Sequence, residues 1–264
     1  ALRHDWSALE GLEQLWPQLE ARHGNNPAIK APHQLPPLTL SYRQLRQQIE
    51  TTASGLAAFG VAEGEVVALF AENGPRWLLA DQGVMRCGAA DAVRGSAAPV
   101  EELRYILSDS GAIALIVESS ALLEKLALDA SQRQRLRLVV LLEGQEPAGW
   151  DAALPCVSWE QLQERGGQQA PPPLPQGGAG RLATILYTSG TTGEPKGVPL
   201  SHANLLHQLR NLGVAVAPSA GDGVLSILPI WHAYERSAEY FLFSCGACQT
   251  YTSIKHFRGD LQRV

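Results

Sequence analysis

The residues best suited to chemistry form one short run of glycines, hydroxyl side chains and a single lysine, between positions 187 and 197. Glycine lets the backbone approach a ligand closely and adopt dihedral angles that other residues avoid. Backbone N–H groups and hydroxyls in such a loop can donate to phosphate oxygens, and a lysine adds a positive charge. The run therefore predicts a phosphate-binding loop, with candidate ligands Thr188, Ser189, Gly190, Thr191, Thr192, Gly193 and Lys196.

The spacing of this run differs from that of the P-loop NTPases, because the four residues after Gly190 lead to Pro195 and not to Gly-Lys-Ser/Thr. A serine- and glycine-rich surface loop without function is the plain alternative. It is less favoured because the run lies between an expected strand at 182–188 and an expected helix capped by Ser201. The glycines and the lack of apolar anchors also predict a loop that is mobile without nucleotide.

A second candidate group is the aromatic pair Trp231 and His232, which is followed by Glu235 and Arg236. The pair can line a site or simply pack into the core, and the residues by themselves leave these two interpretations about even. Glu235 and Arg236 can pair with each other or with the loop, and no chemistry is assigned to them.

Segments of strand and helix character alternate along the chain and would position these candidates. The expected strands are the short apolar runs 66–70, 89–93, 113–117, 138–142 and 182–188. The expected helices follow Ser41, begin at Pro75 and Pro99, and follow Ser158. Such alternation predicts an α/β fold with mostly parallel sheets, covered by helices on both faces.

A stretch rich in proline and glycine, residues 166–180, interrupts this pattern. Such a composition is typical of a linker or an exposed loop. We therefore expect a first α/β subdomain at 1–165 and, after the linker, the start of a second and incomplete α/β subdomain at 181–264. The second subdomain would carry the phosphate loop.

The composition excludes several classes of function. The 264 residues are 45% hydrophobic and 18% charged, which is ordinary for a protein with a sizeable core. A formal net charge of −5 argues against nucleic acid as a partner. No run reaches the roughly 18 apolar residues that a membrane-spanning helix needs. Four cysteines do not make a disulfide framework, so a reducing cytoplasm is expected. Cys245 and Cys248 lie in an apolar, strand-like run, where a structural role is favoured over a redox or zinc role.

The run from Tyr187 to Gly197 resembles the phosphate-loop signature of the acyl-adenylate-forming (AMP-binding) superfamily, which includes acyl-CoA synthetases, firefly luciferase and the adenylation domains of peptide synthetases. The flanking segments 182–185 and 198–204 are similar to the family as well. The sequence Trp-His-Ala-Tyr-Glu-Arg at 231–236 resembles long-chain fatty acid ligases. The resemblance implies that the chain is part of the large N-terminal domain of an adenylate-forming enzyme.

Three further segments, 76–83, 93–96 and 100–103, resemble the cyanobacterial and plastid branch, whose members load fatty acids onto acyl carrier protein. Many relatives have Pro-Leu where this chain has Val93-Arg94, which is a departure from the commoner pattern.

The resemblance implies a reaction in two steps. A fatty carboxylate attacks the α-phosphorus of ATP to give acyl-AMP and pyrophosphate, and a thiol of CoA or acyl carrier protein then attacks the activated carbonyl. By resemblance, the loop at 188–197, Lys196 included, holds the β- and γ-phosphates, and Thr188 helps to hold Mg²⁺. His232 would donate a hydrogen bond near the carboxylate and the α-phosphate, and Trp231 would wall or gate the acyl tunnel. His232 and Lys196 are the expected catalytic residues.

The family also carries motifs further along the chain, including a Tyr-Gly-x-Thr-Glu stretch that none of the six tyrosines here begins. We therefore expect an N-terminal portion that is inactive alone. The expected partners are a fatty acid and CoA or acyl carrier protein, with peripheral contact to a membrane left open. The alternatives are an enzyme for another carboxylic acid and a non-catalytic nucleotide-binding fragment. The length of the acid, the thiol acceptor and the oligomeric state stay open.

Overall fold

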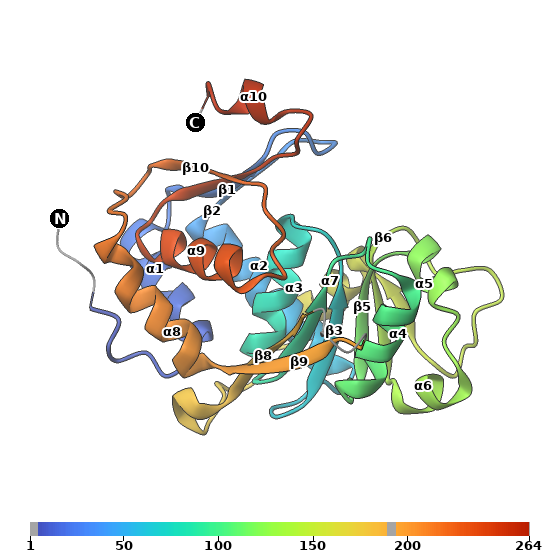
Figure 1. Cartoon of the computed structure of the whole chain (residues 1–264). Helices are drawn as coiled ribbons and strands as arrows, with labels where there is room; N and C mark the ends of the chain where they lie inside the picture. The colour runs from blue at the N-terminus through green and yellow to red at the C-terminus, as the bar shows by residue number, and fades with distance from the viewer. Residues whose placement is uncertain (1–4, 189–193, 264) are drawn as a thin grey trace.

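Two β-sheets and the helices around them form the architecture in the computed structural model, which describes residues 5–188 and 194–263 (Figure 1). The larger sheet has seven strands in the order β7-β6-β5-β3-β4-β8-β9. Their bounds are β3 Val66–Phe70, β4 Ala90–Arg94, β5 Ala114–Ser119, β6 Leu138–Glu143, β7 Cys156–Ser158, β8 Leu182–Thr188 and β9 Lys196–Ser201. All neighbours in this sheet are parallel except β8 and β9.

Helices cover both faces of the larger sheet, which confirms the predicted fold class. Alternate residues of β3, such as Val67 and Ala68, belong to two separate apolar clusters, one on each face. One face packs against α2 (Tyr42–Ala58), α3 (Pro75–Arg86) and α7 (Trp159–Gly167). The other packs against α4 (Val100–Asp109) and α5 (Ser120–Leu126), and α6 (Ala130–Arg135) follows before β6.

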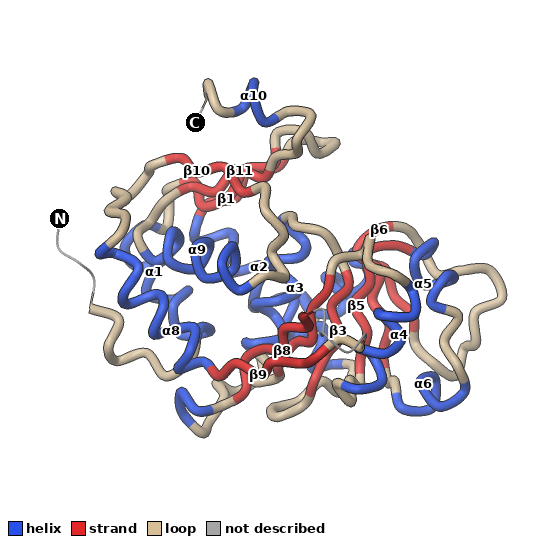
Figure 2. Tube along the Cα trace, viewed as in Figure 1, coloured by secondary structure: helices blue, strands red, loops and turns tan. Residues whose placement is uncertain are grey.

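The smaller sheet joins the two ends of the described chain. Its order is β10-β11-β1-β2, with bounds β1 Pro27–Ala31, β2 Leu38–Ser41, β10 Gly223–Ser226 and β11 Cys248–Tyr251. The remaining helices are α1 Leu15–His23, α8 His202–Asn211, α9 Ala233–Ser244 and α10 Phe257–Asp260, with short 3-10 turns at Leu12–Gln14, Gly178–Gly180 and Leu212–Val214. A layer of helices, including α2 and α9, lies between the two sheets (Figure 2), and one apolar core joins all three layers.

Local capping explains where several helices begin. The side chains of Ser41 and Ser158 each accept a hydrogen bond from the backbone N–H of a glutamine three residues on. The side chain of that glutamine accepts a hydrogen bond from the backbone N–H of the serine, as predicted for α7. Pro75 lies in the first turn of α3, where the missing N–H costs nothing. Among the described residues, no helix combines the length and the apolar character needed to cross a bilayer.

The strand pairing does not follow the division expected at 166–180. Strand β8 pairs with β4, Thr184 facing Asp91, so it extends the sheet of the first part of the chain. Conversely, β1 pairs with β11, which joins the first residues to the last. The expected boundary is a change in composition, and the pairing of β4 with β8 crosses it. A proline-rich connection can equally link two strands of one sheet, and here it runs over the surface from α7, which follows the edge strand β7, to β8. On the way, Arg86 donates to the carbonyl of Pro173.

The strand-like run expected around Cys245 and Cys248 is wrong in its first half. Helix α9 extends to Ser244, Cys245 ends it, and only Cys248 belongs to a strand. The two thiols therefore flank a turn at Gly246, whose φ of 78° is open to glycine without strain. The apolar residues of this segment face a core that a helix and a strand can fill equally well.

Candidate functional site

The predicted phosphate loop is framed by a hairpin of two antiparallel strands. Thr188, the last residue of β8, lies opposite Lys196, the first residue of β9, and both side chains are exposed. The sequence predicted that the loop connects a strand to a helix, and it did not predict strand β9, in which residues 196–201 return along β8 before the helix begins. Helix α8 follows, capped by Ser201 as predicted.

Five of the predicted phosphate ligands, Ser189, Gly190, Thr191, Thr192 and Gly193, lie outside the described residues. Their contact with phosphate and the mobility expected of the loop therefore stay predictions. The two ends of the hairpin, Thr188 and Lys196, fix where the loop leaves and re-enters the sheet.

Packing below the hairpin explains the last glycine of the motif. Tyr187 is buried, and its hydroxyl donates to Oδ2 of Asp109, at the end of α4, over 2.7 Å. Gly197 lies against this ring: a Cβ there would be 3.1 Å from Cζ of Tyr187 and 3.0 Å from Cγ2 of Ile185. A side chain at 197 would therefore push Tyr187 or β9 away. The glycine serves the fit of the hairpin and does not need to touch a ligand.

Trp231 and His232, which the sequence left as either a core pair or a site pair, differ in their surroundings. Trp231 is half-buried against the main core, and its ring rests on Gly95, where a Cβ would be 2.5 Å from Cζ2 of the indole. His232 immediately precedes α9 and is exposed, with its ring centroid 6.2 Å from that of the indole. Packing into the core therefore accounts for Trp231 in part and does not account for His232.

The two predicted motifs meet at one edge of the larger sheet. Strands β3, β4 and β8 are parallel neighbours, so their carboxyl ends lie along the same edge. Thr188 ends β8, and Gly95, which carries the Trp231 ring, directly follows β4. After β3, Glu72 accepts hydrogen bonds from the Ser96 hydroxyl over 3.0 Å and from the Ala97 N–H over 3.2 Å. Crevices at the carboxyl ends of parallel strands are where ligands bind in open α/β sheets.

A buried charge cluster, which the sequence analysis missed, anchors α9 to α3, β4 and β8. The guanidinium of Arg236 contacts both oxygens of Asp91 over 2.9 and 3.0 Å, one oxygen of Asp81, and the Thr184 hydroxyl over 2.6 Å. It also donates to the Tyr240 hydroxyl. Among the described residues, Arg236 thus pairs with Asp81 and Asp91 and not with Glu235, one of the two partners considered from the sequence.

The electrostatics of this cluster follow from two carboxyl groups facing one guanidinium without solvent. Burial and the neighbouring Asp81 carboxylate raise the pKa of Asp91, although Arg236 opposes the shift. The carboxylates in turn raise the pKa of Arg236 against the effect of burial. A sequence signal was present: Asp81 and Asp91 each stand alone inside an apolar helix or strand, and an isolated charge there needs a partner.

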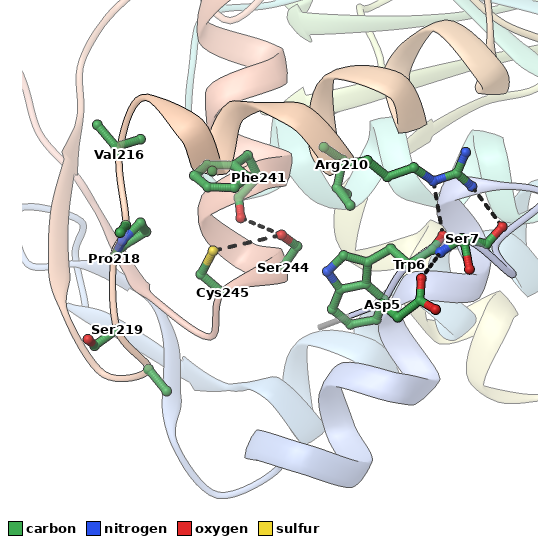
Figure 3. A pocket seen from close by; sticks show the side chains of 14 residues that line it. Asp5, Trp6, Ser7, Arg210, Val216, Pro218, Ser219, Phe241, Ser244 and Cys245 are labelled. Carbon is green, nitrogen blue, oxygen red and sulfur yellow. Dashed lines mark hydrogen bonds between the residues drawn. The ribbon is translucent and has the colours of Figure 1, made fainter. Parts of the chain in front are cut away.

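A cavity of about 600 Å³ lies at the other end of α9 (Figure 3). Its walls come from the first described residues, the end of α8, the segment 216–220 and the last turn of α9, with Trp6, Leu209, Val216 and Phe241 as apolar lining. The twelve residues of α9 span about 18 Å between this cavity and the His232 end. The cavity is therefore separate from the edge where the predicted motifs meet.

The predicted metal ligand, the hydroxyl oxygen of Thr188, lies in the described part of the chain. Within residues 5–188 and 194–263, no three His, Cys, Asp or Glu side chains gather as a metal site. The exposed Thr188 hydroxyl fits a hard-cation ligand, and Mg²⁺ commonly takes its remaining ligands from phosphates and water.

Comparison with known proteins agrees with the predicted family. The model of the family "AMP-binding enzyme" matches residues 17–263. Two chloroplastic proteins of Arabidopsis thaliana, probable acyl-activating enzyme 16 and the long-chain-fatty-acid–[acyl-carrier-protein] ligase AEE15, are each 40% identical to this chain over 98% of its length. The long-chain-fatty-acid–CoA ligase FadD15 of Mycobacterium tuberculosis is 29% identical over 78% of the chain.

The chain spans 37% of the length of the two Arabidopsis proteins. Among solved structures, the inhibitor-bound N-terminal domain of FACL13 from Mycobacterium tuberculosis superposes with a TM-score of 0.78 at 22% identity, over 92% of this chain and 57% of that one. This likeness shows a shared fold. Because the family model matches almost the whole chain, the chain belongs to the AMP-binding enzyme family.

Proposed function

We propose that this chain supplies the nucleotide- and acid-binding part of a ligase that activates a long-chain fatty acid. The acid would react with ATP to give acyl-AMP, and the acyl group would pass to the thiol of CoA or of acyl carrier protein. The observation that carries the proposal is the meeting of two motifs at one sheet edge: the Thr188–Lys196 hairpin ends there, and Trp231 rests there on Gly95. The names of the Arabidopsis and mycobacterial relatives support the choice of a fatty acid.

The exposed polar side chains suit the first step. The loop between Thr188 and Lys196 would hold the β- and γ-phosphates, and the Lys196 ammonium would offset the charge that develops on pyrophosphate. Thr188 would be one ligand of Mg²⁺. His232 is exposed at the start of α9 and would donate a hydrogen bond to the carboxylate or to the α-phosphate. Trp231 would form part of the wall for the acyl chain. Bringing acid and phosphorus together is the main catalytic task.

The acceptor and the setting belong to the proposal as well. One Arabidopsis relative is named as a ligase of acyl carrier protein and the mycobacterial one as a ligase of CoA, so both thiols are candidates. We propose a cytoplasmic reaction, with peripheral contact to the membrane that contains the lipid substrate.

The test is fatty-acid-dependent exchange of pyrophosphate into ATP, measured with Mg²⁺ on the full-length ligase that contains this chain. We expect exchange with palmitate and little with benzoate or amino acids. A preference for benzoate or for an amino acid would overturn the fatty acid as substrate. Exchange with none of these acids would overturn acid activation and favour a non-catalytic nucleotide-binding function.

A further inference from the structure

The loop at 227–232, which carries Trp231 and His232, is held by side chains from outside the loop. It connects β10 to α9, and its own backbone closes one turn, in which the His232 N–H donates to the Pro229 carbonyl over 3.1 Å. In the described part of the chain, side chains that reach its first residues come from Asn73, between β3 and α3, and from Glu235 in α9.

Asn73 supports the loop from the carboxyl end of β3. Its Nδ2 donates to the carbonyl of Leu228 over 3.0 Å and to the hydroxyl of Ser226 over 2.9 Å. A carbonyl only accepts hydrogen bonds, so the amide nitrogen must face Leu228 and the side chain has one allowed orientation. Oδ1 of Asn73 is buried and has no hydrogen-bond partner in the described part of the chain. The residue thus leaves one polar atom unpaired and keeps one contact with the loop and one with the end of β10.

Ser226, which accepts a hydrogen bond from Asn73, also contacts two acidic residues of α9. Its Oγ lies 3.2 Å from Oε1 of Glu235 and 3.3 Å from Oε2 of Glu239. A hydroxyl has one proton and two lone pairs, and Asn73 occupies one lone pair. All contacts are satisfied only if Ser226 donates to one carboxylate and accepts from the other, which then carries a proton.

The proton belongs on Glu239. This side chain is fully buried, and burial followed by the nearby Glu235 raises its pKa to about 8. The second oxygen of Glu239 accepts from the Tyr251 hydroxyl over 3.2 Å. Ser226 therefore donates to Glu235. Burial raises the pKa of this carboxyl, and the Ser226 hydroxyl and the nearby backbone N–H groups of Leu228 and Ile227 oppose the shift by stabilising its charge. The charge of Glu235 is directed at the start of the loop.

We propose that Asn73, Ser226 and Glu235 are positioning residues for the acid-binding side of the site. They fix Leu228 through both its carbonyl and its N–H group, and so set where the Trp231 indole and the His232 imidazole stand. The inference rests on the proposed function of Trp231 and His232.

Asn73→Asp is the sharpest variant, because it keeps the shape and replaces the two donors by acceptors next to the Glu235 carboxylate. The matched control is Asn211→Asp, since Asn211 also donates to a backbone carbonyl, that of His207, but on an exposed helix end. The readouts on this chain are the NMR signals of the Trp231 indole N–H and the His232 ring. We expect both to shift or broaden in Asn73→Asp and to stay in place in Asn211→Asp, while the indole signals of Trp16 and Trp159 stay in both.

Two further variants keep the test decisive if Asn73→Asp does not fold. Glu235→Ala removes the acceptor of the Ile227 and Leu228 N–H groups, whereas Glu235→Gln keeps one acceptor oxygen. We expect displaced Trp231 and His232 signals in the alanine variant and largely restored signals in the glutamine variant. Unchanged signals in both Asn73→Asp and Glu235→Ala would overturn the proposal.

The kinetic consequence is measured on the full-length ligase by pyrophosphate exchange. Loss of the contacts made by Asn73, Ser226 and Glu235 is expected to raise KM for the fatty acid about tenfold and to leave KM for ATP nearly unchanged. An equal rise in both KM values would overturn a specific role at the acid-binding side. A wild-type enzyme without acid-dependent exchange would instead refute the proposed function. The NMR result would still test whether the three residues position Trp231 and His232.

Discussion

Replacing Gly95 by alanine tests whether the Trp231 indole is seated as the structure has it. A Cβ at position 95 would lie 2.5 Å from Cζ2 and 2.6 Å from Cη2 of the indole. Carbon atoms in ordinary contact are about 3.5–4.0 Å apart, so the ring must shift by about 1 Å or turn away. Gly95 has no left-handed φ, and the substitution therefore carries no backbone strain of its own.

The expected cost can be worked out from two opposing effects. Overpacking of a fitted contact costs about 1–3 kcal/mol, whereas replacing glycine by alanine stabilises by about 0.4–1 kcal/mol through the unfolded chain. The net loss in the free energy of unfolding should be about 1–2 kcal/mol, measured by denaturant titration of this chain. In a Trp231→Ala background the contact is gone, and Gly95→Ala should be neutral or slightly stabilising.

The matched control is Gly167→Ala, because Gly167 ends α7 and an added Cβ there meets nothing within 4 Å. It should leave the chain as stable or slightly more stable. If Gly95→Ala cost the same with Trp231 present as with Trp231 removed, the coupling would be absent and the indole could not be resting on Gly95.

Three further predictions concern charge and catalysis. Lys196→Ala in the full-length ligase should weaken MgATP binding by about 1.5–3 kcal/mol in calorimetry, the loss of one charge-assisted contact, and unchanged affinity would remove Lys196 from the phosphate site. His232→Ala should lower the rate of pyrophosphate exchange more than it alters ATP affinity, because the contact of His232 forms mainly in the transition state. A wild-type rate would show that His232 has no role in the reaction. Burial raises the pKa of Glu239 to about 8 in the folded chain, whereas the unfolded chain releases this proton above pH about 4.5. The folded state therefore binds one more proton than the unfolded state between these pH values. The free energy of unfolding should fall as the pH rises from about 5 to about 8. Glu239→Gln should flatten that fall, and an equally steep curve would show that Glu239 is not the group responsible.

The strands of the larger sheet could be predicted because both of their faces are buried. Runs such as 113–117 and 138–142 are continuously apolar, rich in Ile and Val, and too short for a typical helix, which favours a strand buried on both faces. Strand β9 gave no such signal, since four of its six residues are exposed and it contains Gly197 and Pro199. Strand β10 gave little signal as well, because only one of its four residues is buried. Its pairing with β11 depends on tertiary packing, which the local sequence does not show.

The candidate site could be predicted as far as its residues act locally. The phosphate loop was recognisable because glycines, hydroxyls and a lysine follow one another within a few positions. The support for the second motif was not, because Arg236 reaches Asp81 and Asp91 across about 150 residues of sequence. Asn73 and Glu235 are likewise brought together only by the pairing of sheets and helices. Composition shows that a buried charge needs a partner, but not which partner it has.

The Arg236 cluster explains why a charged motif follows the aromatic pair at all. The energy of a buried ion pair largely cancels against the cost of desolvating its members, so an apolar trio could fill the same space with similar stability. An apolar contact tolerates sliding, however, whereas the guanidinium can contact Asp81, Asp91 and Thr184 together in only one register of α9 against α3, β4 and β8. His232 begins that helix, and Trp231 directly precedes it. Fixing the register of α9 therefore fixes the distance of both rings from the edge where Thr188 ends β8. We interpret the arginine as a determinant of position more than of stability.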